Sequence, residues 1–219
     1  MNRIVRLKTY NQRLYRFLEN IPIGAEVLDV GVGQSSLFRE RKTDKRLFIT
    51  GIDILEKNNV DNCVDDYHKI DLNTTELFIH NKMFDAVCCN HVIEHLHSHN
   101  LVRNILKYFV KANGTVYIAG PNERSLFVPS FGFYHEQKSP FNFYDDMTHV
   151  RPVTNQSLFD LMNECGYYNI DVGVRKDRLG FFVIIPKIIM ALIKKDRNKL
   201  VHTVWDLIGW ESQVVARKK

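Results

Sequence analysis

The sequence predicts an α/β fold built on a parallel sheet with helices on both faces. Apolar segments typical of strands alternate along the chain with segments of helical spacing, and the connections between them are short. The 219 residues are 45% hydrophobic and 25% charged, which excludes long disorder, collagen-like repeats and a disulfide scaffold. The length favours a single domain over residues 1–219. The net charge of +5 permits an anionic partner but does not require one.

The first half of the chain carries the regular alternation. An amphipathic helix is predicted over residues 3–18 of an N-terminal segment, 1–20, because apolar residues recur there among Arg and Lys at helical spacing. Pro22 and Gly24 end this helix. Five strands are predicted over residues 26–30, 47–54, 67–72, 84–89 and 114–119. Further helices are predicted from about Ser35, from near Val92 and over residues 100–110.

The regular alternation stops after Asn122. Residues 123–152 are aromatic and irregular, which predicts an insertion between elements of the core. Helical spacing returns over residues 156–165, and Gly166 caps that helix. The remaining predicted elements are two strands over residues 169–174 and 179–185, which complete a core of residues 20–185, and one or two basic amphipathic helices over residues 186–219.

The cysteine content and the apolar segments bear on the compartment. The four cysteines form no CxxC pair, which favours a reduced, cytoplasmic protein, and the N-terminus lacks the continuous apolar segment of a signal peptide. The apolar run over residues 179–193 is interrupted by Pro186 and is shorter than the ~20 residues that a membrane-spanning helix needs. We expect a buried strand followed by an amphipathic helix. The alternative is a basic, apolar tail that makes at most a peripheral contact with an anionic membrane.

Two acidic residues and two glycines lie at the ends of the first two strands. Asp29 closes the first strand, and Gly31 and Gly33 follow in a turn that lets the backbone approach a ligand closely. Asp53 closes the second strand, 20 residues beyond Gly33, where a carboxylate can accept both hydroxyl groups of a ribose. Each feature alone is compatible with an ordinary strand-to-helix turn or a helix cap. Together and in strand order they favour a nucleotide-type cofactor.

A third motif, FDAVCCNHVIEHL over residues 84–96, completes a recognisable set. The VLDVGVGQS turn, the GIDI segment and this motif, in this order and spacing, resemble the class I S-adenosylmethionine-dependent methyltransferases. The resemblance covers about residues 20–185 and implies a Rossmann-like α/β fold with a seven-stranded, mostly parallel sheet. It also implies S-adenosyl-L-methionine as the cofactor. A nicotinamide cofactor is less well supported, because Ser36 stands where GxGxxG needs its third glycine.

The family pattern can be carried over by position. It places Asp29, Gly31 and Gly33 along the methionine part of the cofactor, and Asp53 at the ribose hydroxyls. Ser35 departs from the family, which often has glycine there, but serine is also small. The residues for which the resemblance implies a contact with the cofactor are Asp29, Gly31, Gly33, Asp53, Ile54, Asp71, Leu72, Asn90 and His91.

The string His91-x-x-Glu94-His95 has a formal resemblance to two kinds of metal site. A zinc peptidase helix needs all five residues in one helix, whereas His91 ends a predicted strand. Some metal-dependent O-methyltransferases, including ubiquinone-type and small-RNA 2′-O-methyltransferases, have an ExxEH string, with Glu in place of His91. The lost carboxylate disfavours a hard cation. We therefore expect no metal, with Glu94 and His95 supporting the helix start and lining the pocket floor.

A fourth motif lies within the irregular segment, in an insertion expected on the substrate side. Residues 145–152 read DDMTHVRP and resemble the DDxTHxRP string of bacterial methyltransferases associated with surface-polysaccharide and other glycan gene clusters. His149 is the predicted general base, because an imidazole can take a hydroxyl proton during methyl transfer. The alternative is that His149 only ties down its loop. The residues expected to orient the base or contact the substrate are Tyr144, Asp145, Asp146 and Arg151.

These observations predict an enzyme that O-methylates a hydroxyl of a sugar or another small molecule, in keeping with polysaccharide biosynthesis. The partners expected are a glycan or small-molecule acceptor. A nucleic-acid methyltransferase or binder is the main alternative, but the charge excess is mild and no RNA-binding module is evident. A protein that binds the cofactor and methylates nothing is a further alternative. The sequence carries no prediction of oligomeric state.

Overall fold

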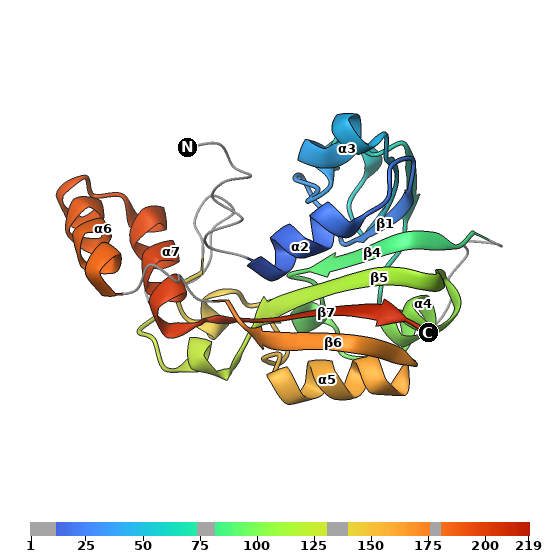
Figure 1. Cartoon of the computed structure of the whole chain (residues 1–219). Helices are drawn as coiled ribbons and strands as arrows, with labels where there is room; N and C mark the ends of the chain where they lie inside the picture. Colours follow the sequence, from blue (N-terminus) through green and yellow to red (C-terminus); the bar gives the residue numbers. More distant parts are fainter. Residues whose placement is uncertain (1–11, 74–81, 131–139, 176–180) are drawn as a thin grey trace.

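The computed structural model describes residues 12–73, 82–130, 140–175 and 181–219. Its centre is one sheet of seven strands in the order β3-β2-β1-β4-β5-β7-β6 (Figure 1). Strands β1 to β5 pair in parallel, and β7 runs antiparallel between β5 and β6. The predicted seven-stranded, mostly parallel Rossmann-like sheet is therefore confirmed. The strands are β1 Glu26–Val30, β2 Phe48–Asp53, β3 Asp66–Lys69, β4 Phe84–Asn90, β5 Val110–Pro121, β6 Tyr167–Val174 and β7 Glu211–Lys218.

Helices cover both faces of the sheet, and two of them stand beyond its end (Figure 1). Short 3-10 turns, η1 to η4, occupy Lys57–Asn59, Ile93–His95, Glu123–Leu126 and Phe143–Asp145. The α-helices are α2 Gln12–Asn20, α3 Arg39–Lys45, α4 Asn100–Tyr108, α5 Asn155–Glu164, α6 Phe181–Ile193 and α7 Arg197–Ile208. The predicted helix over residues 100–110 corresponds to α4, and the one over residues 156–165 to α5. The predicted N-terminal helix falls partly on residues 1–11, outside the described residues.

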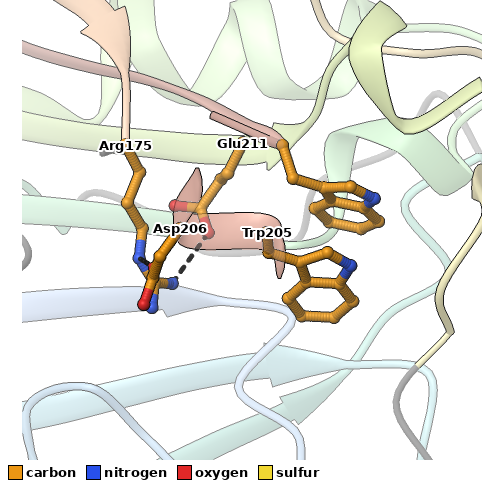
Figure 2. Close-up of a pocket in the computed structure, with 5 residues that line it drawn as sticks. Arg175, Trp205, Asp206 and Glu211 are labelled. Atoms are coloured by element: carbon orange, nitrogen blue, oxygen red, sulfur yellow. Dashed lines mark hydrogen bonds and ion pairs between the residues drawn. The ribbon is translucent and has the colours of Figure 1, made fainter. Parts of the chain in front are cut away.

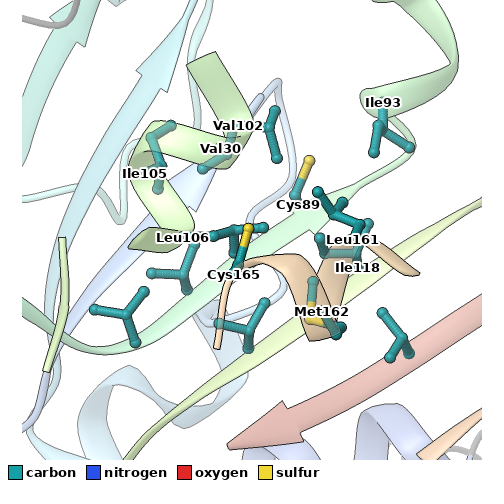
Figure 3. Close-up of a cluster of buried hydrophobic side chains, with 14 of the residues drawn as sticks. Val30, Cys89, Ile93, Val102, Ile105, Leu106, Ile118, Leu161, Met162 and Cys165 are labelled. Carbon is teal, nitrogen blue, oxygen red and sulfur yellow. The ribbon is translucent and has the colours of Figure 1, made fainter. Parts of the chain in front are cut away.

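Two hydrophobic clusters fill the two faces, because neighbouring residues of a strand point to opposite sides. Cys88 packs with α2 residues on one face, and Cys89 packs with α4 and α5 residues on the other. Figure 3 shows this second cluster, in which Ile105 and Leu106 of α4 lie with Leu161 and Met162 of α5 on the same face of the sheet. All four cysteines are free thiols, and Cys63 alone among them is only half-buried. These two layers fix the carboxyl ends of β1 to β4 at one edge.

Two predicted helices in the first half are corrected. The helix expected from Ser35 begins at Arg39, because the backbone N–H of Ser36 is held by the buried carboxylate of Asp61 (2.8 Å) in a turn. The helix expected from near Val92 is only the single turn η2, and the chain becomes helical again at Asn100. In both places the residues after the strand serve the loop at the sheet edge instead of extending a helix.

The C-terminal part contains the largest correction. Residues 181–185 of the predicted last strand belong to α6, and the seventh strand is β7 in the segment predicted to be helical. A continuous apolar run cannot distinguish a buried strand from a helix by its period. The sequence of β7, ESQVVARK, lacks a long apolar run, yet Ser212, Gln213 and Val214 are all buried between β5 and β6.

Helix α6 packs on α7 by one side and leaves the other side exposed. Ile184 and Ala191 are buried, whereas apolar residues over the opposite arc are open to solvent. Within the described residues, no helix combines the length and the apolar character that crossing a membrane requires. The exposed apolar residues of α6 are Ile185, Ile189, Met190, Leu192 and Ile193.

Candidate functional site

A cleft of about 680 Å³ opens at the carboxyl ends of β1, β2, β3 and β4, the edge where open parallel sheets bind ligands. Seven of the nine residues expected to contact a cofactor line it, whereas Asp29 and Asn90 do not. The predicted residues that line it are Gly31, Gly33, Asp53, Ile54, Asp71, Leu72 and His91. His95, expected on the pocket floor, lines it as well. The lining residues that sequence reasoning missed are Leu55, Ile70, Asn73, Val92, Leu96 and Thr148.

The two glycines of the first turn are required for different reasons. Both have positive φ, +68° at Gly31 and +54° at Gly33, a region where side chains other than hydrogen are strained. A Cβ on Gly31 would lie 2.1 Å from Cγ2 of Val92, so this glycine makes room for the segment after β4. A Cβ on Gly33 would meet nothing within 4 Å, so this backbone faces the open cleft. Of the two glycines, Gly33 is therefore the one whose backbone a ligand can approach closely.

The Asp53 carboxylate ties the glycine turn to the end of β2. Its Oδ2 accepts a hydrogen bond from the N–H of Gly33 (2.8 Å), and its Oδ1 accepts one from the N–H of Leu55 (3.1 Å). Asp53 is only 8% exposed and lines the cleft. Since two carboxylate oxygens offer about four acceptor positions, acceptor capacity remains on the cleft side.

A second buried network holds the turn from behind. Ser36 donates its hydroxyl to Oδ2 of Asp29 (2.6 Å), and its N–H donates to Oδ2 of Asp61. Arg39 donates to both carboxylate oxygens of Asp61, at 2.8 and 2.5 Å. The N–H of Asp61 donates to the carbonyl of Gly33 (2.9 Å). The glycine turn is thus fixed by carboxylates behind it.

The two buried carboxyl groups of this network have opposite pKa shifts. Complete burial raises the pKa of Asp29 to about 7, although the hydrogen bond from Ser36 partly lowers it. Burial also acts to raise the pKa of Asp61, but the Arg39 guanidinium and the backbone N–H groups outweigh it and hold that pKa well below its usual range. Asp61 is therefore an anion at neutral pH, whereas Asp29 titrates near neutrality.

The segment after β3 forms another part of the cleft wall. Asp71 is exposed, and its Oδ1 accepts a hydrogen bond from the N–H of Asn73 (2.9 Å), while Leu72 is buried at 7% exposure. Ile54 is 60% exposed at the mouth of the cleft. A polar acceptor beside apolar side chains suits a flat, partly polar ring system.

His91 closes the cleft at the end of β4 in a strained conformation. Its φ is +55°, which is rare for a residue with a bulky side chain. Its Nδ1 lies 3.3 Å from Oε1 of Glu94, and its Nε2 lies 3.2 Å from Oε2 of Glu211 on β7. Glu211 in turn pairs with Arg175 (3.2 Å), which also pairs with Asp206 (3.3 Å). Figure 2 shows Arg175, Asp206 and Glu211 clustered beside Trp205.

The carboxylates on both sides make His91 a cation at neutral pH. Burial alone would lower the pKa of His91, but the hydrogen bonds to Glu211 and Glu94 raise it to about 10. The pKa of Glu211 shows the reciprocal effect: burial acts to raise it, whereas His91 and Arg175 hold it at about 2. A row of alternating charges therefore runs from the cleft, through β7, to α7.

A second group of titratable side chains gathers on the far side of Glu94. Ligand atoms of Glu94, His95 and His149 all lie within 4.8 Å of one another. Glu94 is fully buried, and its Oε2 has no hydrogen-bond partner among the described residues. The His95 and His149 rings lie 4.7 Å apart. Thr148 links this group to Asp146: its hydroxyl donates to Oδ1 of Asp146 (2.6 Å) and its oxygen lies 2.8 Å from Nδ1 of His95.

The structure places the predicted base, His149, behind His95 and not on the cleft wall. Its side chain is 4% exposed, its Nδ1 donates to the carbonyl of Phe143 (2.6 Å), and its ring lies against that of Phe143. Burial lowers the pKa of His149, although the Phe143 carbonyl partly raises it. Burial also acts to raise the pKa of Asp146, but the hydrogen bonds from Thr148 bring it below its usual value. His149 therefore both ties down its loop and contributes to the group beside the cleft.

The other residues predicted to contact a substrate lie outside the cleft lining. Asp145 is buried and accepts hydrogen bonds from the N–H groups of Phe141 (2.9 Å) and Asn142 (3.0 Å), so these contacts assign it to loop formation. Tyr144 is 63% exposed. Arg151 contacts His99 (3.1 Å) and lines a separate depression of about 390 Å³ beside α5. The sequence signal that could have found Thr148 was its position next to His149 in the DDMTHVRP motif.

Comparisons with known proteins agree with this geometry. A family model described as a methyltransferase domain matches residues 1–172, and no curated protein matches the chain. The fold is similar to that of a SAM-dependent methyltransferase from Archaeoglobus fulgidus, with a TM-score of 0.58 and 21% identity over 98% of this chain and 92% of that one. It is also similar to an S-adenosylmethionine-dependent methyltransferase from Mesorhizobium loti, with a TM-score of 0.62 and 16% identity over 94% of this chain and 95% of that one.

A third similar structure contains a bound cofactor. It is Haemonchus contortus phosphoethanolamine N-methyltransferase 2 in complex with S-adenosyl-L-methionine, with a TM-score of 0.58 and 18% identity. The match covers 94% of this chain and 51% of that one. At these identities the three structures establish the fold but carry no information on the acceptor.

Proposed function

The chain belongs to the methyltransferase-domain family, and we propose that it transfers the methyl group of S-adenosylmethionine to a hydroxyl group of a sugar or another small molecule. It is a class I S-adenosylmethionine-dependent methyltransferase. The proposal concerns the residues that hold the cofactor, the chemical class of the acceptor and the groups that act on the acceptor.

The cleft has the features that this cofactor requires. Gly33 presents its backbone to open space, so that the methionine part can lie against it. The buried Asp53 keeps acceptor capacity for two ribose hydroxyls, and Asp71 with Leu72 offers a polar and an apolar contact for the adenine. We assign Asp29 a supporting role, since it holds the turn through Ser36 and does not line the cleft.

The reaction is an in-line displacement at the methyl carbon. The acceptor oxygen forms a bond to this carbon as the carbon–sulfur bond breaks, and the sulfur keeps the electron pair. The hydroxyl proton passes to a base or to solvent. Because the sulfonium already activates the carbon, the protein contributes mainly orientation and the removal of that proton.

The observation that carries the acceptor assignment is the position of His95 and Thr148 on the cleft wall, with His149 behind them. The Thr148 hydroxyl donates its hydrogen to Asp146, so its oxygen accepts from Nδ1–H of His95. The Nε2 of His95 then keeps a lone pair, which is the group that an acceptor hydroxyl needs at the moment of transfer. We propose that the acceptor hydroxyl is placed beside this imidazole pair.

The test is a methyl-transfer assay with matched acceptors. The purified protein is incubated with S-adenosylmethionine and with pairs of sugars and small molecules that differ only in carrying a hydroxyl or an amine at one position. Mass spectrometry then locates the added methyl group. We expect methylation of hydroxyl-bearing members, and a fall in turnover of ~10²–10⁴ in a His95→Ala variant that binds S-adenosylhomocysteine normally. Methylation confined to the amines, or full activity of His95→Ala, would show the acceptor assignment to be wrong.

A further inference from the structure

Three buried or half-buried donors beside the cleft form a group that has no role in binding the cofactor. We propose that Glu94, His95 and His149 bind one divalent transition-metal ion, of the borderline class to which zinc and cobalt belong. This inference rests on the proposed function for its catalytic meaning, but the binding of the metal can be measured without it. It also revises the expectation from the sequence that no metal is held here.

The first support is the buried carboxylate of Glu94. Its Oε1 is occupied by His91, and its Oε2 has no hydrogen-bond partner within the described part of the chain although the side chain is fully buried. A buried carboxylate oxygen without a partner is costly, and such groups in native proteins call for an explanation such as an ion. A Cβ on Gly120 would lie 2.9 Å from this oxygen, so the glycine in β5 keeps the space beside it free.

The second support is the orientation of the two imidazoles. The carbonyl of Phe143 can only accept, so His149 donates its Nδ1–H there and keeps the lone pair on Nε2. His95 donates its Nδ1–H to Thr148, whose own hydrogen goes to Asp146, and it also keeps the lone pair on Nε2. Histidines that bind metals have this arrangement, in which the second nitrogen donates to a carbonyl, or to a hydroxyl bound by a carboxylate.

The third support is the distance between the donors. The ligand atoms of the three residues lie within 4.8 Å of one another. Two ligand atoms of a tetrahedral zinc ion, each about 2.1 Å from it, lie about 3.4 Å apart, so binding requires the donor atoms to move inward by up to about 1.4 Å relative to one another. Two imidazoles and one carboxylate, with the remaining positions open, suit zinc or cobalt better than magnesium, which prefers oxygen ligands.

This geometry also suggests what the ion does. His95 lines the cleft, so an open coordination position next to it faces the acceptor. With an ion bound, the Nε2 lone pair of His95 would be held by the metal, so His95 would act on the acceptor through the ion instead of accepting the proton itself. The ion would lower the pKa of the hydroxyl that it binds, and the proton could then leave to solvent. The cationic His91 is not a ligand in this arrangement, because both of its nitrogens face carboxylates.

The experiment is a titration of the metal-free protein with Co²⁺, followed by visible absorption, which reports coordination independently of activity. We expect one ion per chain, competition by Zn²⁺, and loss of the absorption band in His149→Ala and in His95→Gln. The exposed His97→Ala is the matched control and should bind like the wild type. Circular dichroism and S-adenosylhomocysteine binding establish that each variant is folded. The Thr148→Val variant removes only the hydroxyl behind His95 and should bind Co²⁺ about 10–100-fold more weakly.

Absence of Co²⁺ binding by the folded wild type, or equal binding by all of these variants, would overturn the metal site. The two proposals fail separately. Specific Co²⁺ binding without any hydroxyl methylation would leave the site and reject the acceptor class. Hydroxyl methylation that continues in the presence of a chelator would leave the acceptor class and reject the role of the ion in the reaction.

An independent observation concerns α6. The side of α6 opposite α7 presents an unbroken apolar face, defined here as Ile185, Pro186, Ile189, Leu192 and Ile193. The residues at and after the C-terminal end of α6 are basic: Lys194, Lys195 and Lys199 are exposed, and Asp196 is the acidic residue between them. We propose that this face inserts into the surface of an anionic membrane, with the lysines at the headgroups.

The charge and the apolar character of this part of α6 together favour a lipid surface as the partner. An apolar helix face that continues into a cluster of lysines matches the acyl region and the anionic headgroups of a bilayer together. Since α6 is too short to span, the contact is peripheral and should weaken as salt screens the headgroups.

The experiment is flotation with vesicles of phosphatidylcholine, with and without phosphatidylglycerol. We expect binding to the anionic vesicles only, a loss of about 20-fold in Lys194→Gln/Lys195→Gln, and a larger loss in Ile189→Asp/Ile193→Asp. The Ile23→Asp variant changes an equally exposed isoleucine elsewhere on the surface and should bind normally. Equal binding to neutral vesicles, no binding to either kind, or a stable dimer that Ile189→Asp/Ile193→Asp dissociates, would overturn the proposal.

Discussion

The glycine-loop region, residues 26–73, and the closing region, residues 167–219, both depend on buried charged groups. They differ in how far apart in the sequence the interacting residues lie. In the glycine-loop region, the side-chain contacts of Asp29, Asp53 and Asp61 that hold the turn join residues 7 to 25 positions apart. In the closing region Glu211 pairs with Arg175 across 36 positions and with His91 across 120. The first network is therefore local in the chain, whereas the second exists only once the sheet has closed.

The largest expected effect is on cofactor affinity, when Asp53 is replaced at the cleft side of the glycine-loop network. Asp53→Ala removes the acceptor of the Gly33 N–H and two charge-assisted hydrogen bonds to ribose, each worth about 1.5–3 kcal/mol. Calorimetry with S-adenosylhomocysteine should show affinity reduced by at least ~100-fold. The exposed Asp44→Ala on α3 serves as the control. Unchanged affinity in a folded Asp53→Ala protein would remove Asp53 from the cofactor site.

The matching experiment in the closing region replaces His91. His91→Asn tolerates the positive φ but leaves Glu94 and Glu211 without their shared cation, which should cost about 3–5 kcal/mol of unfolding free energy at pH 7. The pKa of His91 is raised to about 10, so its stabilising contribution is fully present below pH ~6.5 and is lost as the pH rises through 10. Denaturant unfolding should therefore show a difference between variant and wild type that shrinks as the pH rises from about 6.5 to 10 and has disappeared above pH 10. A difference independent of pH would indicate packing instead of charge.

The pH-dependent test in the glycine-loop region replaces Asp29, and here the substitution is expected to stabilise the protein, not to destabilise it. The pKa of Asp29 is raised to about 7, so the folded protein retains a proton that the unfolded chain loses from pH ~4 upward. Stability from this group falls as pH rises from about 4 to 7 and then levels off. Asn cannot ionise, so Asp29→Asn should gain up to about 2–4 kcal/mol over the wild type by pH 8 and little at pH 4. Thermal melts across this range, with Asp44→Asn as the control, test the sign.

The smallest expected effect is on the free energy of unfolding, when the tryptophans of the closing region are replaced. Trp205 and Trp210 stack at 4.2 Å, and both indole N–H groups point to the carbonyl of Phe141, at 3.5 Å from Trp205 and 3.1 Å from Trp210. Trp210→Phe should cost about 1 kcal/mol of unfolding free energy, and Trp205→Phe clearly less, because the longer bond is weaker. Urea titrations followed by circular dichroism measure both. Equal losses would show that stacking outweighs the hydrogen bond.

The sequence by itself determined the cofactor half of the molecule. The positions of β1, β2 and β4, the glycine turn and Asp53 were readable because strand ends, turn glycines and acidic residues follow one another within short stretches of chain. Local chemistry determines those elements, since a positive φ needs glycine and a short apolar segment between turns forms a strand.

Tertiary structure alone decided the other half. The polar sequence of β7 becomes a strand because β5 and β6 offer it hydrogen bonds on both sides. The apolar run of α6 becomes a helix that packs on α7 beyond the end of the sheet. The sequence predicted a functional role for His149, but not its place behind His95. That place depends on the contact between Thr148 and His95, which are 53 positions apart in the sequence. Contacts of this range leave no periodic pattern in the sequence, because their energy is gained only after the chain has closed.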